Sequence, residues 1–406
     1  MARKKSEDDF YSNIATKTGG MTLDTAGKVS YFVDTGNLAL NYICSQRFIG
    51  GGIPGGKITE VYGPPATSKS LLGYCCLASC QRMDGISVLL DCERAGNADF
   101  AMNAGHVDPA KLITYEPISI KQVETKIIAA TKAIRAHFGL DKPILFVWDS
   151  IGVTPSEREW KETSLDENPT KAEIKAAGGS ERPGERARQS GDLLRKINPF
   201  LNENNATLFV INQTRNKIGV MYGSPETTAG GGEALKFFAS CRLRTSIGKI
   251  IESKTGLPLG VNLTFQNKKS RSSVPGLKTT GVQLFFESGI NPLGGILTLL
   301  LNIGRIVTVG KSRFKVCEPY SDGQDVEFTV SVTKRNDIPI EVITKCPKLI
   351  DAKNQKQVED YLALFKGAID LSFGDSIVEK ESKGEEDSDE ESDFIAELSK
   401  DQSEEE

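Results

Sequence analysis

Eight consecutive residues have the types and spacing of a loop that holds the phosphates of a nucleotide. Residues 63–70 read Gly-Pro-Pro-Ala-Thr-Ser-Lys-Ser and match Gly63, Lys69 and Ser70 of the pattern G-x-x-x-x-G-K-[ST]. In that pattern backbone N–H groups cradle the phosphates, the lysine reaches the β- and γ-phosphates, and the hydroxyl binds Mg²⁺. Ser68 replaces the second glycine, at a position that is costly for a residue with a Cβ, so an ordinary strand-to-helix turn remains an alternative. The expected ATP-binding residues here are Gly63, Pro64, Pro65, Ala66, Thr67, Ser68, Lys69 and Ser70.

Two carboxylates follow apolar runs and could complete a hydrolytic site. Asp149 ends the run at 144–148 and precedes Ser150, and Glu93 follows the run at 86–91. Strand C-termini of an open α/β sheet converge on one crevice, where an aspartate can hold Mg²⁺ and a glutamate can deprotonate the attacking water. Taken alone, an aspartate after a strand is more often a turn or helix cap. Together these side chains predict nucleotide hydrolysis, with Asp149 and Ser150 at the nucleotide and with Ser70 and Asp149 as the metal ligands.

A third segment combines glycine, basic and aromatic residues. A predicted strand ends at Gln213, and the glycine-rich loop after it carries Arg215, Lys217 and Tyr222, with no acid until Glu226. Glycine turns, basic side chains and an aromatic ring can together hold a single-stranded nucleic acid backbone and contact its bases. On composition alone, a flexible surface loop accounts for the same residues.

These three segments need an α/β framework to bring them together. Apolar runs that read as strands alternate with segments of helical period, which implies parallel pairing and a sheet covered on both faces. After about residue 245 the pattern changes to strands with short turns, and near residue 291 it becomes helical again. The expected strands are 58–62, 86–91, 144–148, 207–211, 261–265 and 281–286; the expected helices are 8–16, 70–81, 120–138 and 192–201, with 161–189 as a loop.

The charge is distributed unevenly along the chain. Residues 375–406 hold 15 acids and 3 lysines, a net charge of −12, so the whole-chain net charge of −4 leaves +8 for residues 1–374. A basic body suits a polyanionic partner. The acidic tail is either a solvated, disordered extension or an internal competitor for the same basic surface. We expect a segment at 1–35, an ATPase core at 36–290, a small C-terminal domain at 291–373 and the tail at 374–406.

Composition excludes several other classes of protein. The longest apolar stretch, 296–303, is too short for a membrane span, and the basic start has no apolar run after it. With two histidines the chain offers few ligands for a zinc site, and eight cysteines without a CxxC pair indicate reduced thiols. We therefore expect a cytoplasmic protein with no membrane partner.

Residues 211–243 closely resemble the second DNA-binding loop of RecA recombinases, with one extra residue at 230–233. Residues 52–64, which read Gly-Ile-Pro-Gly-Gly-Lys-Ile-Thr-Glu-Val-Tyr-Gly-Pro, look like the family's entry to its phosphate loop. The resemblance runs from about residue 48 to residue 300. The imperfect phosphate loop and the acidic tail are more like the phage branch, the UvsX-like recombinases, whereas the loop is closer to the bacterial proteins. The fold implied is a RecA-like P-loop ATPase core with a mostly parallel sheet flanked by helices.

The resemblance implies roles for residues around the nucleotide. Glu93 matches the catalytic glutamate, Lys69 the phosphate-loop lysine, and Gln213 the glutamine that senses the γ-phosphate and moves the DNA-binding loop. Asn97 and Phe100 fall where the family has an aspartate and a tyrosine around the adenine, so contacts to the base are in question.

Three more residues are expected to act in trans, on the ATP of a neighbouring protomer. Lys236 and Phe237 match residues that act across the subunit interface. Lys268 matches one of two lysines that reach the neighbour's ATP, and Lys269 or Arg271 could compensate for the other.

The resemblance also implies which residues contact DNA. Two arginines match DNA-contacting arginines that follow the family's first loop, whose tip falls at 183–184. Residues 161–182 look longer and more charged than that loop, and solvation explains those charges equally well. The expected DNA-binding residues are Pro183, Gly184, Arg188, Arg195, Arg215, Asn216, Lys217, Ile218, Tyr222, Gly230, Gly231 and Gly232.

The activity implied is that of an ATP- and Mg²⁺-dependent homologous recombinase. Such a protein polymerises as a helical filament on single-stranded DNA, pairs it with a homologous duplex and exchanges strands, with the N-terminal segment docked on the neighbouring protomer. A single-strand-binding protein and a loading mediator are further expected partners. Two alternatives remain: a ring-forming motor or helicase on the same core, and a non-catalytic DNA-binding mediator.

Overall fold

The central sheet has the order β12-β11-β10-β9-β3-β7-β6-β4-β5 in the computed structural model, which describes residues 2–22, 29–96, 98–163, 184–216, 226–228, 230–330, 338–373 and 377–380. The strands from β9 to β5 are parallel, and those from β9 to β12 are antiparallel. The predicted fold class is confirmed. The strands are β3 (Ile58–Gly63), β4 (Ile86–Asp91), β5 (Leu112–Tyr115), β6 (Ile144–Asp149), β7 (Ala206–Asn216), β9 (Cys241–Ser253), β10 (Pro258–Ser270), β11 (Lys278–Phe285) and β12 (Gly289–Ile290).

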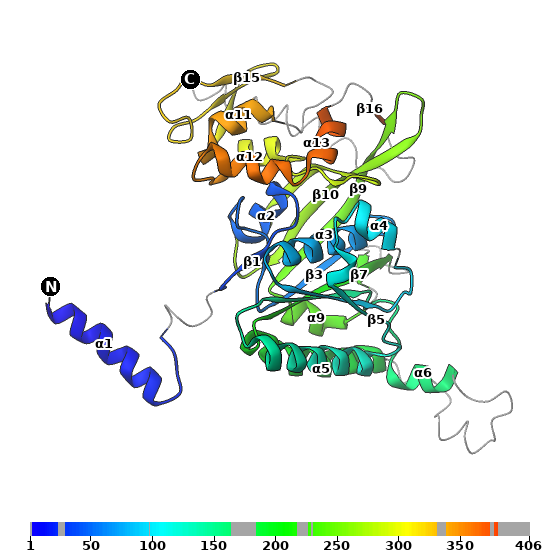
Figure 1. The fold of residues 1–406 in the computed structure, drawn as a ribbon. Coiled ribbons are helices and arrows are strands. Elements are labelled where there is room, and N and C mark those ends of the chain that lie inside the picture. The colour runs from blue at the N-terminus through cyan, green and yellow to red at the C-terminus, as the bar shows by residue number, and fades with distance from the viewer. Residues whose placement is uncertain are drawn as a thin grey trace.

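Helices cover both faces of the parallel strands, as Figure 1 shows. Along β6, Leu145 and Val147 join the core under α3 (Lys69–Arg82), while Phe146 and Trp148 join the core under α5 (Ile120–Phe138) and α8 (Glu185–Glu203). Successive side chains of a strand point to opposite faces, so a strand buried on both faces is apolar throughout. This is why the apolar runs predicted these strands correctly.

Helix α8 differs from the prediction, because residues 185–189 were assigned to a loop and instead form its first turn. These residues, Glu-Arg-Ala-Arg-Gln, include only one apolar side chain, so they show no helical period of apolar residues. The buried residues further along, among them Ser190, Leu193, Leu194 and Ile197, have the spacing of one helix face. A short helix, α6 (Glu157–Thr163), also begins before the predicted loop.

The C-terminal elements carry a second sheet that the sequence did not reveal. It has the order β13-β14-β15 and lies with α11, α12 and α13 beyond α2 in Figure 1. Arg305 ties these elements to the core: its guanidinium lies over the rings of Tyr42 and Phe48 and donates to the carbonyl of Leu349 at 2.7 Å. The elements are α2 (Leu38–Ser45), α10 (Ile296–Asn302), β13 (Ile306–Gly310), β14 (Arg313–Val316), β15 (Glu327–Thr329), α11 (Ile340–Lys345), the 3₁₀ turn Pro347–Ile350, α12 (Gln355–Ala363) and α13 (Lys366–Phe373).

The two ends of the chain meet the core differently. Helix α1 (Ala2–Lys17) lies apart from the sheet in Figure 1, and β1 (Phe32–Val33) pairs with β2 (Ile53–Pro54). The hydroxyl of Tyr31 lies 2.7 Å from that of Thr207, and burial raises the pKa of Tyr31 to about 12. Within the predicted disordered tail, β16 (Ile377–Lys380) pairs with the edge of β9 at residues 250–253, so these four residues correct that prediction. No helix among the described residues is long and apolar enough to cross a bilayer. The division into four segments remains a prediction.

Candidate nucleotide site and nucleic-acid interface

The residues predicted to bind and hydrolyse a nucleotide lie at the carboxyl edge of the parallel strands. Gly63 of β3 lies opposite Gln213 of β7, and Asp149 of β6 lies opposite Asp91 of β4. Strand β9 also comes close to this edge at Thr245, because a Cβ on Gly63 would meet the carbonyl oxygen of Thr245 at 2.3 Å. The sheet register therefore brings together side chains that are far apart in the sequence, at the edge where α/β proteins bind ligands.

The phosphate loop adopts the conformation expected of such loops although it lacks the second glycine. Ser68 has φ +51°, and Ala66 has φ +62°. Each position costs on the order of 1–2 kcal/mol relative to glycine. Lys69 is the first residue of α3, and its Nζ donates to the carbonyl of Pro64 at 2.5 Å and to the hydroxyl of Thr67 at 3.0 Å. The lysine is thus held over the loop at a helix N-terminus.

One buried cation faces several carboxylates at this edge. Burial lowers the pKa of Lys69 to about 8, although Asp149 and Glu93 oppose the shift. Burial also raises the pKa of Asp149 to about 6; Glu93 and Asp91 add to the shift, while a hydrogen bond from Ser70 opposes it. A hydroxyl and a carboxylate side by side are ligands that suit Mg²⁺, which keeps several waters and binds substrate phosphates. Among the described residues, no three His, Cys, Asp or Glu side chains are grouped so that they could hold a metal ion by themselves.

Glu93 is positioned by residues from two other strand ends. Ser150, after β6, donates to Glu93 Oε1 at 2.6 Å, and Gln213, on β7, donates to the same oxygen at 3.5 Å. Glu93 itself follows β4 and is exposed, so a water molecule can reach its carboxylate. A carboxylate in this position can accept a proton from water.

Asp91 is a site residue that the sequence reasoning missed. It is 8% exposed, accepts a hydrogen bond from the amide of Gly96 at 3.0 Å, and is one of two carboxylates that help burial raise the pKa of Tyr74 to about 12. It ends an apolar run two residues before Glu93, and that position was the signal that could have revealed it. Its role here is to shape the turn that carries Glu93.

Of the two residues expected at the adenine, the structure describes one. Phe100 lies on α4 (Ala98–Asn103), half-buried, and its ring meets that of Tyr74 edge-to-face with the centroids 6.4 Å apart. Asn97 lies outside the described residues. The packing of Phe100 on α3 places an aromatic ring beside the helix that begins at Lys69.

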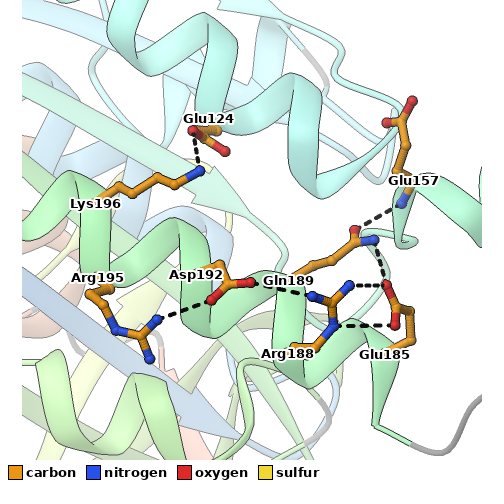
Figure 2. A network of polar contacts seen from close by, with 8 residues as sticks. All are labelled: Glu124, Glu157, Glu185, Arg188, Gln189, Asp192, Arg195 and Lys196. Atoms are coloured by element: carbon orange, nitrogen blue, oxygen red, sulfur yellow. Dashed lines mark hydrogen bonds and ion pairs between the residues drawn. The ribbon is translucent and has the colours of Figure 1, made fainter.

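The predicted DNA-contacting arginines lie on the exposed face of α8, which Figure 2 shows. The side chains of Arg188 and Arg195 are 65% and 71% exposed. Asp192 lies between them, 3.7 Å from Arg188 and 3.0 Å from Arg195, and Glu185 accepts from Arg188 at 2.8 Å. Exposed pairs of this kind contribute little to stability, so the arginines can exchange these carboxylates for phosphates. Gly184 is the N-cap of the helix with φ +89°, and Pro183 lies outside the described residues.

The second predicted loop begins as a strand pair and ends on three glycines. Within β7, Arg215 and Asn216 pair with residues of β8 (Glu226–Thr228). Gly231 and Gly232 have φ values of +76° and +53°, which favour glycine, and they start α9 (Gly232–Phe238). Lys217, Ile218 and Tyr222 lie outside the described residues.

The three residues expected to act in trans are not near the nucleotide edge of their own chain. Lys236 and Phe237 are on α9, Phe237 is 67% exposed, and Lys268 is exposed on β10. This end of β10 pairs with the start of β9, beside Thr59, which is four residues or about 13 Å along β3 from Gly63. Lys269 donates to the carbonyls of Lys236 and Phe237 at 2.7 Å, so it caps α9. The predicted action of these residues on a neighbour's nucleotide stays a prediction.

Comparisons with known proteins agree with this arrangement. The family model described as the RecA N-terminal domain matches residues 11–135 and 164–291. Protein RecA of Chloroherpeton thalassium is 31% identical over 278 residues, which cover 68% of this chain and 70% of that protein. Protein RecA of Chlorobaculum tepidum is 32% identical over 278 residues, 68% of this chain and 72% of that protein. Protein RecA of Nocardioides sp. is 31% identical over 312 residues, 76% of this chain and 81% of that protein.

Proposed function

This chain belongs to the RecA family of proteins for DNA recombination and repair, and we propose that it is a DNA-dependent ATPase that forms helical filaments on single-stranded DNA and exchanges strands with a homologous duplex. One observation carries the proposal: Gln213 contacts Glu93 at the nucleotide edge and begins the segment that leads into the glycine loop. A residue shared by two sites can couple them, because a ligand that moves it at one site biases the other.

The residues at the nucleotide edge divide the chemistry among them. Lys69 and the backbone of the phosphate loop would hold the β- and γ-phosphates of ATP. Ser70 and Asp149 would hold Mg²⁺, which neutralises charge that develops on the phosphate oxygens. Glu93 would take a proton from the attacking water as the bond to the leaving ADP breaks, and Ser150 and Gln213 keep its carboxylate in place.

The position of α9 supports assembly into filaments. Because Lys236, Phe237 and Lys268 lie at the opposite edge from the phosphate loop, contact with a neighbour's ATP is head-to-tail. Head-to-tail interfaces that do not close give open helical filaments. Helix α1 would dock on the neighbour as well, since Phe10 and Tyr11 are 60% and 66% exposed on it.

We also propose that the chain belongs to the phage-like branch of the family, because Ser68 replaces the second glycine of the phosphate loop and the chain carries an acidic tail. Removal of residues 375–406 should tighten DNA binding, most visibly at low salt, if the tail competes for the basic body; unchanged affinity would mean that the tail is only solvated. A single-strand-binding protein and a loading mediator are the further partners that filament assembly would involve.

Strand exchange tests the proposal. The chain, with ATP and Mg²⁺, should transfer a strand from a homologous duplex to circular single-stranded DNA, and should fail with a heterologous duplex or without ATP. Electron microscopy of the same mixture should show helical filaments. Closed rings without exchange would favour a motor or helicase, and DNA binding without any ATP hydrolysis would favour a mediator.

A further inference from the structure

The side chain of Asn212 holds both ends of the segment between residues 213 and 230. Its Oδ1 accepts from the amide of Gln213 at 2.9 Å and from the amide of Gly230 at 3.1 Å. Its Nδ2 donates to the carbonyl of Gly230 at 3.0 Å and to Glu60 Oε1 at 2.9 Å. Asn212 is fully buried, so all four of these contacts are made away from solvent.

Glu60 determines which way the Asn212 carboxamide faces. An ionised carboxylate only accepts hydrogen bonds, so Nδ2 must point at Glu60, and Oδ1 is then left for the two amides. If the amide were flipped, its oxygen would face Glu60 and its NH₂ group would face two N–H donors. Glu60 is fully buried and forms an ion pair with Arg242, which donates to its other oxygen and lies over the ring of Tyr62, 4.6 Å from the centroid.

This cluster lies between the nucleotide edge and the glycine loop. Glu60 is on β3, three residues before Gly63. Gly230 is packed so closely on the turn after β6 that a Cβ on it would meet the carbonyl oxygen of Ile151 at 2.7 Å. Ile151 directly follows Ser150, which holds Glu93. One carboxamide therefore connects β3, the end of β7 and the first glycine after the loop.

We propose that Asn212, oriented by Glu60 and Arg242, is a positioning residue that couples the Gln213–Glu93 contact to the DNA-binding loop. The inference rests on the proposed function. With both ends of the loop fixed to one side chain, a displacement of Gln213 at the nucleotide is passed to Gly230 rather than absorbed in the backbone. Without the carboxamide the two ends separate, so ATP still binds but DNA no longer accelerates its hydrolysis.

The variant Asn212→Asp tests this coupling. It keeps the shape of the side chain, removes both Nδ2 hydrogen bonds and sets a second carboxylate against Glu60. Asn37→Asp is the matched control: Asn37 is also fully buried and donates two hydrogen bonds, to the carbonyls of Asn291 and Gly294, and neither of these partners belongs to β3, β7 or the turn after β6. Both variants lose buried hydrogen bonds, so a purely structural effect would appear in both.

Three quantities should be measured for each chain: the melting temperature, the affinity for a fluorescent ATP analogue, and the ratio of hydrolysis rates with and without single-stranded DNA. For Asn212→Asp the ratio should fall about 10-fold, within the range of typical coupling between sites, with ATP affinity within about twofold of the wild type. Asn37→Asp should lower the melting temperature and keep the wild-type ratio. The double variant Glu60→Gln with Asn212→Asp should regain part of the ratio, because the amide introduced at position 60 can donate to the new carboxylate.

The outcomes separate this inference from the function it rests on. A wild-type ratio near one would overturn the proposed function and the inference with it. A wild-type ratio well above one that survives in Asn212→Asp, or that Asn37→Asp loses equally, overturns the inference alone. If Asn212→Asp does not fold, Gly230→Ala displaces the other end of the loop from Ile151; it should lose the ratio too, and a retained ratio overturns the inference.

Discussion

The nucleotide edge of the sheet and the exposed face of α8 carry their charges in opposite ways. Lys69 is 7% exposed and is held by its own loop, and the residues around it are anchored on buried strands. Arg188 and Arg195 are mostly exposed and pair with carboxylates of the same helix. The side chains of the nucleotide edge are therefore in place before a ligand binds, whereas the arginines of α8 can exchange their carboxylate partners for phosphates at a small cost in free energy. Nucleotide binding should therefore depend strongly on single side chains, whereas each side chain that contacts DNA should contribute only a small part of the DNA affinity.

Lys69→Ala should give the largest loss of ATP affinity. It removes the buried cation from the phosphate loop, and hydrogen bonds to charged groups contribute about 1.5–3 kcal/mol, so ATP affinity should fall by about 10- to 150-fold. Equilibrium binding of an ATP analogue measures this. Lys111→Ala, which loses an exposed pair with Asp108, is the control. ATP binding and strand exchange that survive in Lys69→Ala would contradict the assignment of the site.

Glu93→Gln should stop ATP hydrolysis without loss of ATP binding. A positioned general base contributes about 10²–10⁴-fold, and hydrolysis should fall by that factor while ATP affinity and filaments persist. Glu116→Gln is the matched control, since Glu116 follows the neighbouring strand β5 at the same edge and pairs with exposed Arg94. Hydrolysis retained in Glu93→Gln would mean that another group activates the water.

Arg195→Ala should have a moderate effect on DNA binding, smaller than the effects of changes at the nucleotide edge. Loss of one phosphate contact should weaken single-stranded DNA binding several-fold and reduce the salt slope by about 1. Binding titrations at three or more salt concentrations measure both. Lys366→Ala removes an exposed i,i+4 pair on α13 and should leave the slope alone. An unchanged slope in Arg195→Ala would remove this arginine from the interface.

Asp192→Asn should give the smallest effect, and in the opposite direction. It frees Arg188 and Arg195 from their shared carboxylate, so DNA binding should tighten by about twofold to fivefold at low salt, consistent with the small energies of exposed pairs. Glu203→Gln changes the net charge equally at the far end of α8 and should not tighten binding as much. Equal tightening in both variants would mean that only net charge matters.

The same contrast explains what could be predicted from the sequence. Strand ends and the phosphate loop are local features, so Gly63, Lys69 and Asp149 could be placed on one edge from apolar runs and the parallel order alone. The start of α8 was missed because residues 185–189 are all polar or charged except Ala187, so no apolar period marks the helix. The Asn212 cluster joins residues 18 and 152 positions apart, and only the sheet register brings them into contact.

The most direct test of the account is the rate of ATP hydrolysis by the wild-type chain, with Mg²⁺, in the absence and presence of single-stranded DNA. If the nucleotide edge and the DNA-binding loop communicate through Gln213, the rate should rise at least about fivefold with DNA, the lower end of typical coupling, and saturate as the DNA binds. A rate that is the same with and without DNA would contradict the account.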